Sequence, residues 1–160
     1  MSDKLQFDDY FMLQAILIRS RASCDRASVG SVLVRDKRII STGYNGSVSG
    51  QEHCSGEHGV GHHLIDGHCV RTVHSEINAI SQCAKYGIST NGAILYVTHF
   101  PCLNCTKSII QAGISKVIYL NDYRVDSFAL ELLNNSGIIL EKHNLNISNE
   151  QILDIINLNW

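Results

Sequence analysis

The sequence has few of the features that mark nucleic-acid-binding proteins. Its 160 residues include 13 Lys and Arg against 15 Asp and Glu, which gives a formal charge of −2, and basic residues form no run. Binding to nucleic acid depends on many Lys and Arg contacts to phosphates, so a dedicated nucleic-acid surface is not expected. This charge balance does not exclude a small anionic substrate.

Long hydrophobic runs are also missing. The apolar run from Phe11 to Ile18 is broken by Gln14 and is far shorter than the roughly 20 residues that a transmembrane helix needs. The N-terminus lacks the basic segment and apolar core of a secretory signal. We therefore expect a cytoplasmic protein that does not engage a membrane and whose six cysteines are reduced.

The sequence contains no internal repeat, low-complexity tract or linker. A chain of 160 residues is long enough to bury a sizeable core and is the size of one domain. Residues 1–160 are therefore expected to form a single domain.

Hydrophobic periodicity predicts an alternating series of helices and strands. Helices are expected at residues 7–21, 72–86, 102–113, 126–136 and 149–158, and strands at 29–34, 38–43, 93–98, 116–120 and 137–141. The first two strands form a hairpin, and Ser148 to Gln151 have the spacing of a capping box. The later alternation indicates parallel strands with helices on the faces of the sheet. Several apolar residues of the first helix share one face and are expected in the core: Phe7, Tyr10, Phe11, Leu17 and Ile18.

Between the second strand and the second helix, residues 44–71 are rich in Gly, Ser and His and lack a regular period. Such a long irregular segment in a compact domain is usually functional or disordered. We interpret it as a Cys/His-rich insertion within the domain.

The starts of the second and third helices carry the residues of a metal site. His74 opens the segment H-S-E, and Cys102 and Cys105 belong to P-C-L-N-C, where Pro101 suits the start of a helix. One imidazole and two thiolates with an open fourth position are typical of catalytic zinc. A helix N-terminus favours negative charge, which suits thiolate ligands.

Glu76 is expected to act beside the metal rather than to bind it. It lies two residues after His74, about 200° round a helix axis, so one ion would not easily collect both side chains. Two thiolates, a neutral imidazole and a dication sum to zero charge, so this site acidifies water less readily than an all-imidazole site. A proton acceptor is then needed, and Glu76 is the candidate.

A C-x-x-C pair alone is more often structural zinc or a redox pair. A redox pair has no need of His74 and Glu76, and a closed zinc finger has no need of a spare carboxylate, so the combination favours catalysis. H-x-E followed by P-C-x-x-C is the signature of zinc-dependent nucleobase deaminases. The other residues of these types are expected to have ordinary roles. Cys83 is expected to be a small buried hydrophobe, and His99 and His143, which have no partners in sequence, are expected to be ordinary polar residues.

Three segments carry a more specific resemblance: G-Y-N-G-S at 43–47, H-S-E-I-N-A-I at 74–80, and T-H-F-P-C-L-N-C-T-K at 98–107. Together they closely resemble the deoxycytidylate (dCMP) deaminases, in particular the bacterial type encoded with late competence genes, over about residues 21–123. One departure is Ser75, where this family usually has alanine. The resemblance implies a cytidine deaminase-like α/β/α sandwich of three layers with a mixed five-stranded sheet.

The resemblance also implies an activity, the hydrolysis of dCMP to dUMP and ammonia, which feeds thymidylate synthesis. By this likeness His74, Cys102 and Cys105 hold the zinc, and Glu76 moves protons from water to ring N3 and to the departing amine. Asn45 resembles the residue that grips the sugar, although a simple turn explains Asn45-Gly46 nearly as well.

Tyr123 and Arg124 follow the strand at 116–120, at the end where open α/β sheets bind ligands. They are candidates for contact with the base or the phosphate of the substrate. Solvated loop residues are the alternative.

The resemblance further implies a second, structural zinc, because Cys24 and Cys54 match its cysteine positions. Cys69 and one histidine, for which we favour His62, would complete a closed set of four ligands. Such a site would supply the order that a long loop without a core needs.

Many members of this family are hexamers that dCTP activates and dTTP inhibits. Arg26, Gly43 and Asn45 lie in segments that resemble the region binding those effectors. Two alternatives stay open: a deaminase of another base, such as tRNA adenosine or a free nucleoside, and a zinc-binding competence protein without catalytic activity. The acidic balance weighs against a tRNA substrate, and Glu76 weighs against an inert protein.

Overall fold

The computed structural model describes residues 4–157 and is built on one mixed five-stranded sheet with the strand order β2-β1-β7-β8-β9. The strands are β1 (Gly30–Arg35), β2 (Arg38–Tyr44), β7 (Ile94–His99), β8 (Lys116–Asn121) and β9 (Ile139–Lys142). β1 pairs antiparallel with both β2 and β7, whereas β7, β8 and β9 run parallel. The carboxyl ends of β2, β7 and β8 therefore lie at the same edge of the sheet.

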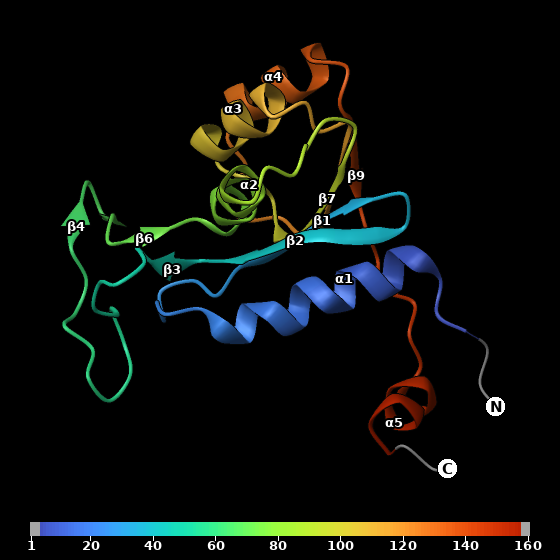
Figure 1. Ribbon diagram of the computed structural model, residues 1–160, viewed down its shortest axis with the longest axis horizontal. Coiled ribbons are helices and arrows are strands. Elements are labelled where there is room, and N and C mark those ends of the chain that lie inside the picture. The colour runs from blue at the N-terminus through green and yellow to red at the C-terminus, as the bar shows by residue number, and fades with distance from the viewer. Residues whose placement is uncertain (1–3, 158–160) are drawn as a thin grey trace.

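Helices cover both faces of this sheet. α1 (Phe7–Ile18) lies on one face, and α2 (Ser75–Lys85), α3 (Leu103–Gln111) and α4 (Ser127–Asn135) lie on the other (Figure 1). Alternate residues of the strands feed two cores, so that Val32 and Tyr96 pack with α1 while Leu33 and Leu95 pack on the opposite side. This is the expected sandwich of three layers.

The buried face of α1 differs from the expected one. Phe11 is buried, but Phe7, Tyr10 and Leu17 are 53%, 40% and 66% exposed, and Met12 and Ala15 take their place against the sheet. Since α1 is apolar on nearly every side, hydrophobicity alone does not mark the face that meets the sheet.

The insertion holds little regular structure. It contains three two-residue strands, β3 (Gly46–Ser47), β4 (Leu64–Ile65) and β5 (His68–Cys69), and it extends to one side of the sandwich (Figure 1). The chain then forms β6 (Thr72–Val73), which pairs with β3, where the sequence predicted the first turn of a helix. His74 is still extended at φ −66° and ψ 152°, so α2 begins only at Ser75.

The last helix, α5 (Asn149–Asn157), carries the predicted capping box. Ser148 N donates to Gln151 Oε1 at 3.0 Å, and Gln151 N donates to Ser148 Oγ at 3.1 Å. Residue 158, the predicted end of this helix, lies outside the described residues. Within residues 4–157, we find no helix with the length and apolarity needed to cross a membrane.

Candidate active site and metal centre

Two helix starts bring three metal-binding side chains together. His74 is the N-cap of α2, Cys102 is the N-cap of α3, and Cys105 lies in the first turn of α3. The His74 Nδ1 atom is 3.4 Å from the Sγ atom of each cysteine. The potential ligand atoms of the three residues all lie within 4.8 Å of one another. The structure thus brings together the three residues that the sequence predicted as ligands.

This donor set fits a zinc ion. Tetrahedral zinc holds sulfur at about 2.3 Å and nitrogen at about 2.1 Å, which places such ligands about 3.6 Å apart. Hydrogen bonds with Cys105 and His74 lower the pKa of the Cys102 thiol to about 4, whereas the neighbouring Cys102 and burial raise the pKa of Cys105. Two adjacent thiols resist ionising together, and a dication between them would remove this conflict.

Glu76 is buried beside these donors. Its side chain lies in the first turn of α2, is 4% exposed, and acts electrostatically on both His74 and Cys105. The Ser75 hydroxyl donates a 2.9 Å hydrogen bond to Glu76 Oε2. Burial raises the pKa of Glu76, which is the direction that suits a group exchanging protons near neutral pH.

A second group of potential ligands joins the insertion to the segment before β1. Its members are Cys24, Cys54, His62 and Cys69, with ligand atoms within 4.8 Å of one another. Cys24 Sγ is 3.7 Å from His62 Nδ1, and Cys54 Sγ is 3.6 Å from Cys69 Sγ. Tetrahedral zinc spaces two sulfur ligands about 3.8 Å apart, and four protein donors are the closed set of a structural site.

The thiols of the second group differ in their readiness to ionise. Burial and the hydrogen bond with Cys69 raise the pKa of Cys54 to about 12. Hydrogen bonds from the Arg71 backbone and from His62 outweigh burial and lower the pKa of Cys69 to about 7. As in the first group, neighbouring thiols oppose each other's ionisation, and a cation would relieve this opposition.

Asp25 supports the second group and was missed by the sequence reasoning. Its Oδ1 lies 3.0 Å from His62 Nε2, while His62 Nδ1 faces Cys24. A carboxylate on the far nitrogen of a metal-binding histidine fixes the tautomer and the orientation of the ring. The available signal was its position directly after Cys24.

Comparison with known proteins agrees with this geometry. Residues 5–121 match the family described as "Cytidine and deoxycytidylate deaminase zinc-binding region". The chain belongs to this deaminase family.

Relatives of this deaminase cover most of its length. ComE operon protein 2 of Bacillus subtilis is 48% identical over 155 residues, which span 97% of this chain and 79% of that protein. The deoxycytidylate deaminase of Saccharomyces cerevisiae is 37% identical over 141 residues, which span 85% of this chain and 44% of the yeast protein. The dCMP deaminase of cyanophage S-TIM5, solved in complex with dCMP and dUMP, matches with a TM-score of 0.75 and 33% identity over 89% of this chain and all of the phage chain. The predicted family and fold are confirmed.

The predicted substrate residues of the deaminase follow the carboxyl ends of β2 and β8. The Asn45 side chain accepts a 2.8 Å hydrogen bond from Val29 N and donates one to the Ala27 carbonyl, so it shapes the segment before β1. These bonds use one of the two amide hydrogens of Asn45. Beyond β8, the Arg124 guanidinium lies 5.4 Å from the centroid of the Tyr123 ring. Substrate contact by these residues stays a prediction.

The predicted effector residues have structural contacts in the deaminase. Arg26 donates a 2.8 Å hydrogen bond to the Gly67 carbonyl and so ties the segment before β1 to the insertion. Gly43 lies so close to α2 that a Cβ atom there would meet the Ser75 carbonyl oxygen at 2.0 Å. Effector binding at Arg26, Gly43 and Asn45 stays a prediction.

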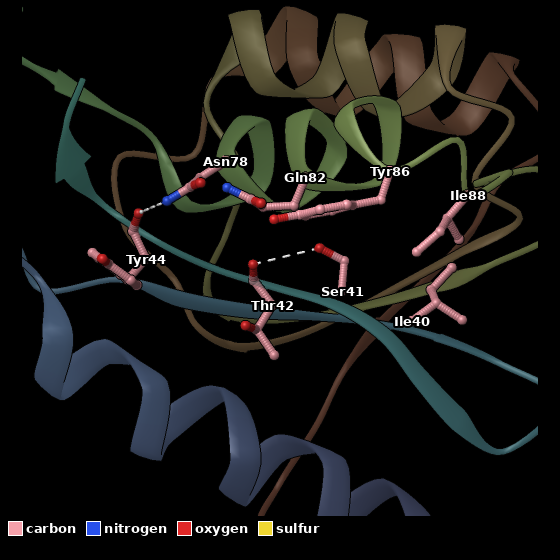
Figure 2. A pocket seen from close by; sticks show the side chains of 8 residues that line it. All are labelled: Ile40, Ser41, Thr42, Tyr44, Asn78, Gln82, Tyr86 and Ile88. Atoms are coloured by element: carbon pink, nitrogen blue, oxygen red, sulfur yellow. Dashed lines mark hydrogen bonds between the residues drawn. The ribbon is translucent and has the colours of Figure 1, made fainter. Parts of the chain in front are cut away.

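A cavity of about 320 Å³ lies between β2 and α2 (Figure 2). Its lining residues are Ile40, Ser41, Thr42, Tyr44, Asn78, Gln82, Tyr86 and Ile88. This lining includes no charged residue, and it includes neither Glu76 nor the donors of the first metal group. The cavity is therefore separate from the reactive groups, and it offers no cation for a phosphate.

Both histidines for which the sequence shows no partner have one in the structure. His143 Nε2 is 2.8 Å from Asp9 Oδ1, and His99 Nδ1 is 2.9 Å from Thr98 Oγ1. Asp9 lies 134 positions before His143, a separation at which sequence spacing carries no signal. Cys83 is fully buried, as expected.

Proposed function

We propose that this deaminase converts dCMP and water to dUMP and ammonia in the cytoplasm, as a single zinc-dependent domain with an insertion at about residues 44–71. The observation that carries the proposal is the buried Glu76 carboxylate beside His74, Cys102 and Cys105. Relatives named deoxycytidylate deaminase and a phage relative solved with dCMP and dUMP support this substrate.

The proposed residues divide the chemistry between them. Zinc held by His74, Cys102 and Cys105 would supply a Lewis acid that makes water more acidic. Glu76 would accept a proton from the water that attacks C4 of the base and deliver that proton to ring N3. Glu76 would then take the remaining proton of that water from the C4 hydroxyl and pass it to the amine, which leaves as ammonia while C4 becomes a carbonyl. One water is consumed and one ammonia is released.

Neither alternative function has a specific observation in its favour. A tRNA:A34 deaminase structure matches at 22% identity and a TM-score of 0.56, which is a likeness of fold alone. An inert zinc-binding protein would have no use for a carboxylate buried beside a metal site that has only three protein ligands.

Ammonia release from dCMP, dCTP, cytidine and deoxycytidine, measured side by side, tests the proposal. We expect dCMP to be the best substrate. Glu76→Ala should keep the bound zinc and lower turnover by about 10²- to 10⁴-fold, the range typical of a lost acid–base group. Glu131→Ala, a change on the exposed surface of α4, is the matched control. If Glu76→Ala retained full turnover, the proposed role of Glu76 would be excluded.

We also propose that Cys24, Cys54, His62 and Cys69 hold a second zinc ion with a structural role. Their spacing and the closed set of four donors support this assignment. Zinc analysis of the purified protein should give two equivalents per chain, and a value of one would refute the second site.

Regulation is proposed on the family resemblance alone. We propose a homo-oligomer, with a hexamer favoured, that dCTP activates and dTTP inhibits through the region of Arg26, Gly43 and Asn45. Sedimentation of the purified protein and dCMP turnover with each triphosphate test this proposal. A monomer with a flat response to both nucleotides would dispose of it.

A further inference from the structure

His99 is a polar residue that the proposed chemistry does not use. It lies at the edge of the sheet where the carboxyl ends of β2, β7 and β8 meet, which we call the reactive edge. It ends β7 and lies three residues before Cys102, and its register partner in β8 is Asn121. Its ring is half-buried and meets the Tyr123 ring edge-to-face at a centroid distance of 5.6 Å. His99 thus contacts one of the residues predicted to bind the substrate.

A hydrogen bond with Thr98 bears on which ring nitrogen of His99 carries the proton. Thr98 is fully buried, and its Oγ1 accepts a 3.2 Å hydrogen bond from Gly30 N. The hydroxyl proton of Thr98 needs an acceptor, and His99 Nδ1 lies 2.9 Å away. With Nδ1 taken as this acceptor, the proton of the neutral ring lies on Nε2. His99 can then donate a hydrogen bond through Nε2–H.

The surroundings of His99 favour a neutral ring near positive charge. Burial and the charge of Arg19 lower the pKa of His99. Arg124 lies over the Tyr123 ring and adopts φ +45°, a left-handed conformation that is costly for a residue other than glycine. A neutral donor whose ring neighbour Tyr123 carries the Arg124 guanidinium, and which feels the charge of Arg19, suits an anionic oxygen.

We propose that His99 is a specificity-determining residue, whose Nε2–H donates a hydrogen bond to the 5′-phosphate of the nucleotide substrate. Arg124, and Arg19 at the end of α1, supply the positive charge around that phosphate. This inference rests on the proposed function, because it assigns the phosphate of dCMP to the side of the reactive edge formed by β7 and β8. His99 acts in binding and leaves the chemistry to Glu76.

The test compares His99→Leu, which removes the donor, with His99→Gln, which keeps an N–H group at a similar reach. Hydrogen bonds to charged groups contribute about 1.5–3 kcal/mol. His99→Leu should therefore lower kcat/KM for dCMP about 10- to 100-fold, mainly through KM, and leave kcat/KM for deoxycytidine unchanged. His99→Gln should recover most of the loss. An equal loss on both substrates, or no loss on dCMP, would overturn the proposal.

Binding measurements keep this inference separate from the proposed function. Calorimetry with dUMP and with deoxyuridine needs no turnover. If the wild-type protein fails to deaminate dCMP yet loses affinity for dUMP alone on His99→Leu, the function fails and the phosphate contact stands. If both ligands bind equally to wild type and variant, the phosphate contact fails whatever the activity. ¹⁵N NMR of the free protein should show His99 protonated at Nε2, and protonation at Nδ1 would contradict the assignment. His58→Gln, in the exposed insertion, is the matched histidine control.

Discussion

Ser75 and Glu76, consecutive residues at the start of α2, share a hydrogen bond: the Ser75 hydroxyl donates to Glu76 Oε2 at 2.9 Å. Both side chains are buried. Burial raises the pKa of Glu76, and the bond from Ser75 acts in the opposite direction because it stabilises the carboxylate. Ser75 therefore holds the proposed proton acceptor and limits the rise of its pKa.

The first prediction concerns Ser75→Ala. Without the hydroxyl, the Glu76 carboxylate loses one stabilising bond, so the pKa of Glu76 should rise further. The acidic limb of kcat/KM against pH should then move to higher pH, because Glu76 must be ionised to accept a proton. At pH values on the acidic limb, we expect the turnover of Ser75→Ala to be roughly tenfold below that of the wild type, with KM nearly unchanged.

A pH–rate profile of Ser75→Ala with dCMP measures this shift. Ser108→Ala removes a serine hydroxyl that bonds to the Asn104 carbonyl in α3, and its profile should match that of the wild type. An acidic limb that stays in place in Ser75→Ala would show that the hydroxyl does not govern Glu76.

The residues of the first metal group could be named from the sequence because each is tied to local structure. His74 lies at the start of α2, and Cys102 and Cys105 lie at the start of α3. Each ligand is therefore close in the chain to the residues that begin its own helix. The second group was harder to predict, since Cys24, Cys54, His62 and Cys69 span 46 positions and an irregular loop. The structure gathers all four, including the weakly favoured His62.

Features that depend on distant packing could not be predicted. The apolar residues of α1 lie all round the helix, so the side that meets the sheet is decided by contacts with β1 and β7. The partner of His143 is Asp9, from the other end of the chain. The role of Asn45 in holding the backbone at Ala27 and Val29 depends on how two segments meet.

The second prediction is that Gly43→Ala destabilises the protein. A Cβ atom at this position would meet the Ser75 carbonyl oxygen at 2.0 Å and the Ala79 nitrogen at 2.6 Å, both in the backbone of α2. Separating β2 from α2 should cost about 3 kcal/mol, or a fall in Tm of roughly 6–12 °C. Thermal unfolding measures this loss.

Gly50→Ala is the control for Gly43→Ala. Gly50 adopts φ +79°, but nothing lies within 4 Å of the added Cβ. It should therefore cost only the about 1–2 kcal/mol of a left-handed alanine. Equal losses in the two variants would mean that the close approach of β2 to α2 has no special importance.

The third prediction separates the two metal groups. Cys54→Ser should reduce the zinc content from two equivalents per chain to one, and protease should then cut the insertion at 44–71 faster because a source of order is lost. Cys83→Ser changes a fully buried cysteine outside both groups and should keep two equivalents. Unchanged zinc content in Cys54→Ser would remove Cys54 from the ligand set.

The fourth prediction is that Asp25→Ala weakens the second metal site without emptying the first. Asp25 Oδ1 lies 3.0 Å from His62 Nε2, so loss of this carboxylate should free the ring to rotate away from Cys24. Removing such a carboxylate typically lowers metal affinity about 10- to 100-fold. Titration with a chelator of graded strength should therefore remove one zinc from Asp25→Ala at a lower chelator concentration than from the wild type. The other zinc should leave both proteins at the same chelator concentration.

Glu52→Ala, an exposed change in the same insertion, is the control for Asp25→Ala and should behave as the wild type. If Asp25→Ala released both ions together, the two sites would be coupled and Asp25 would act on more than His62.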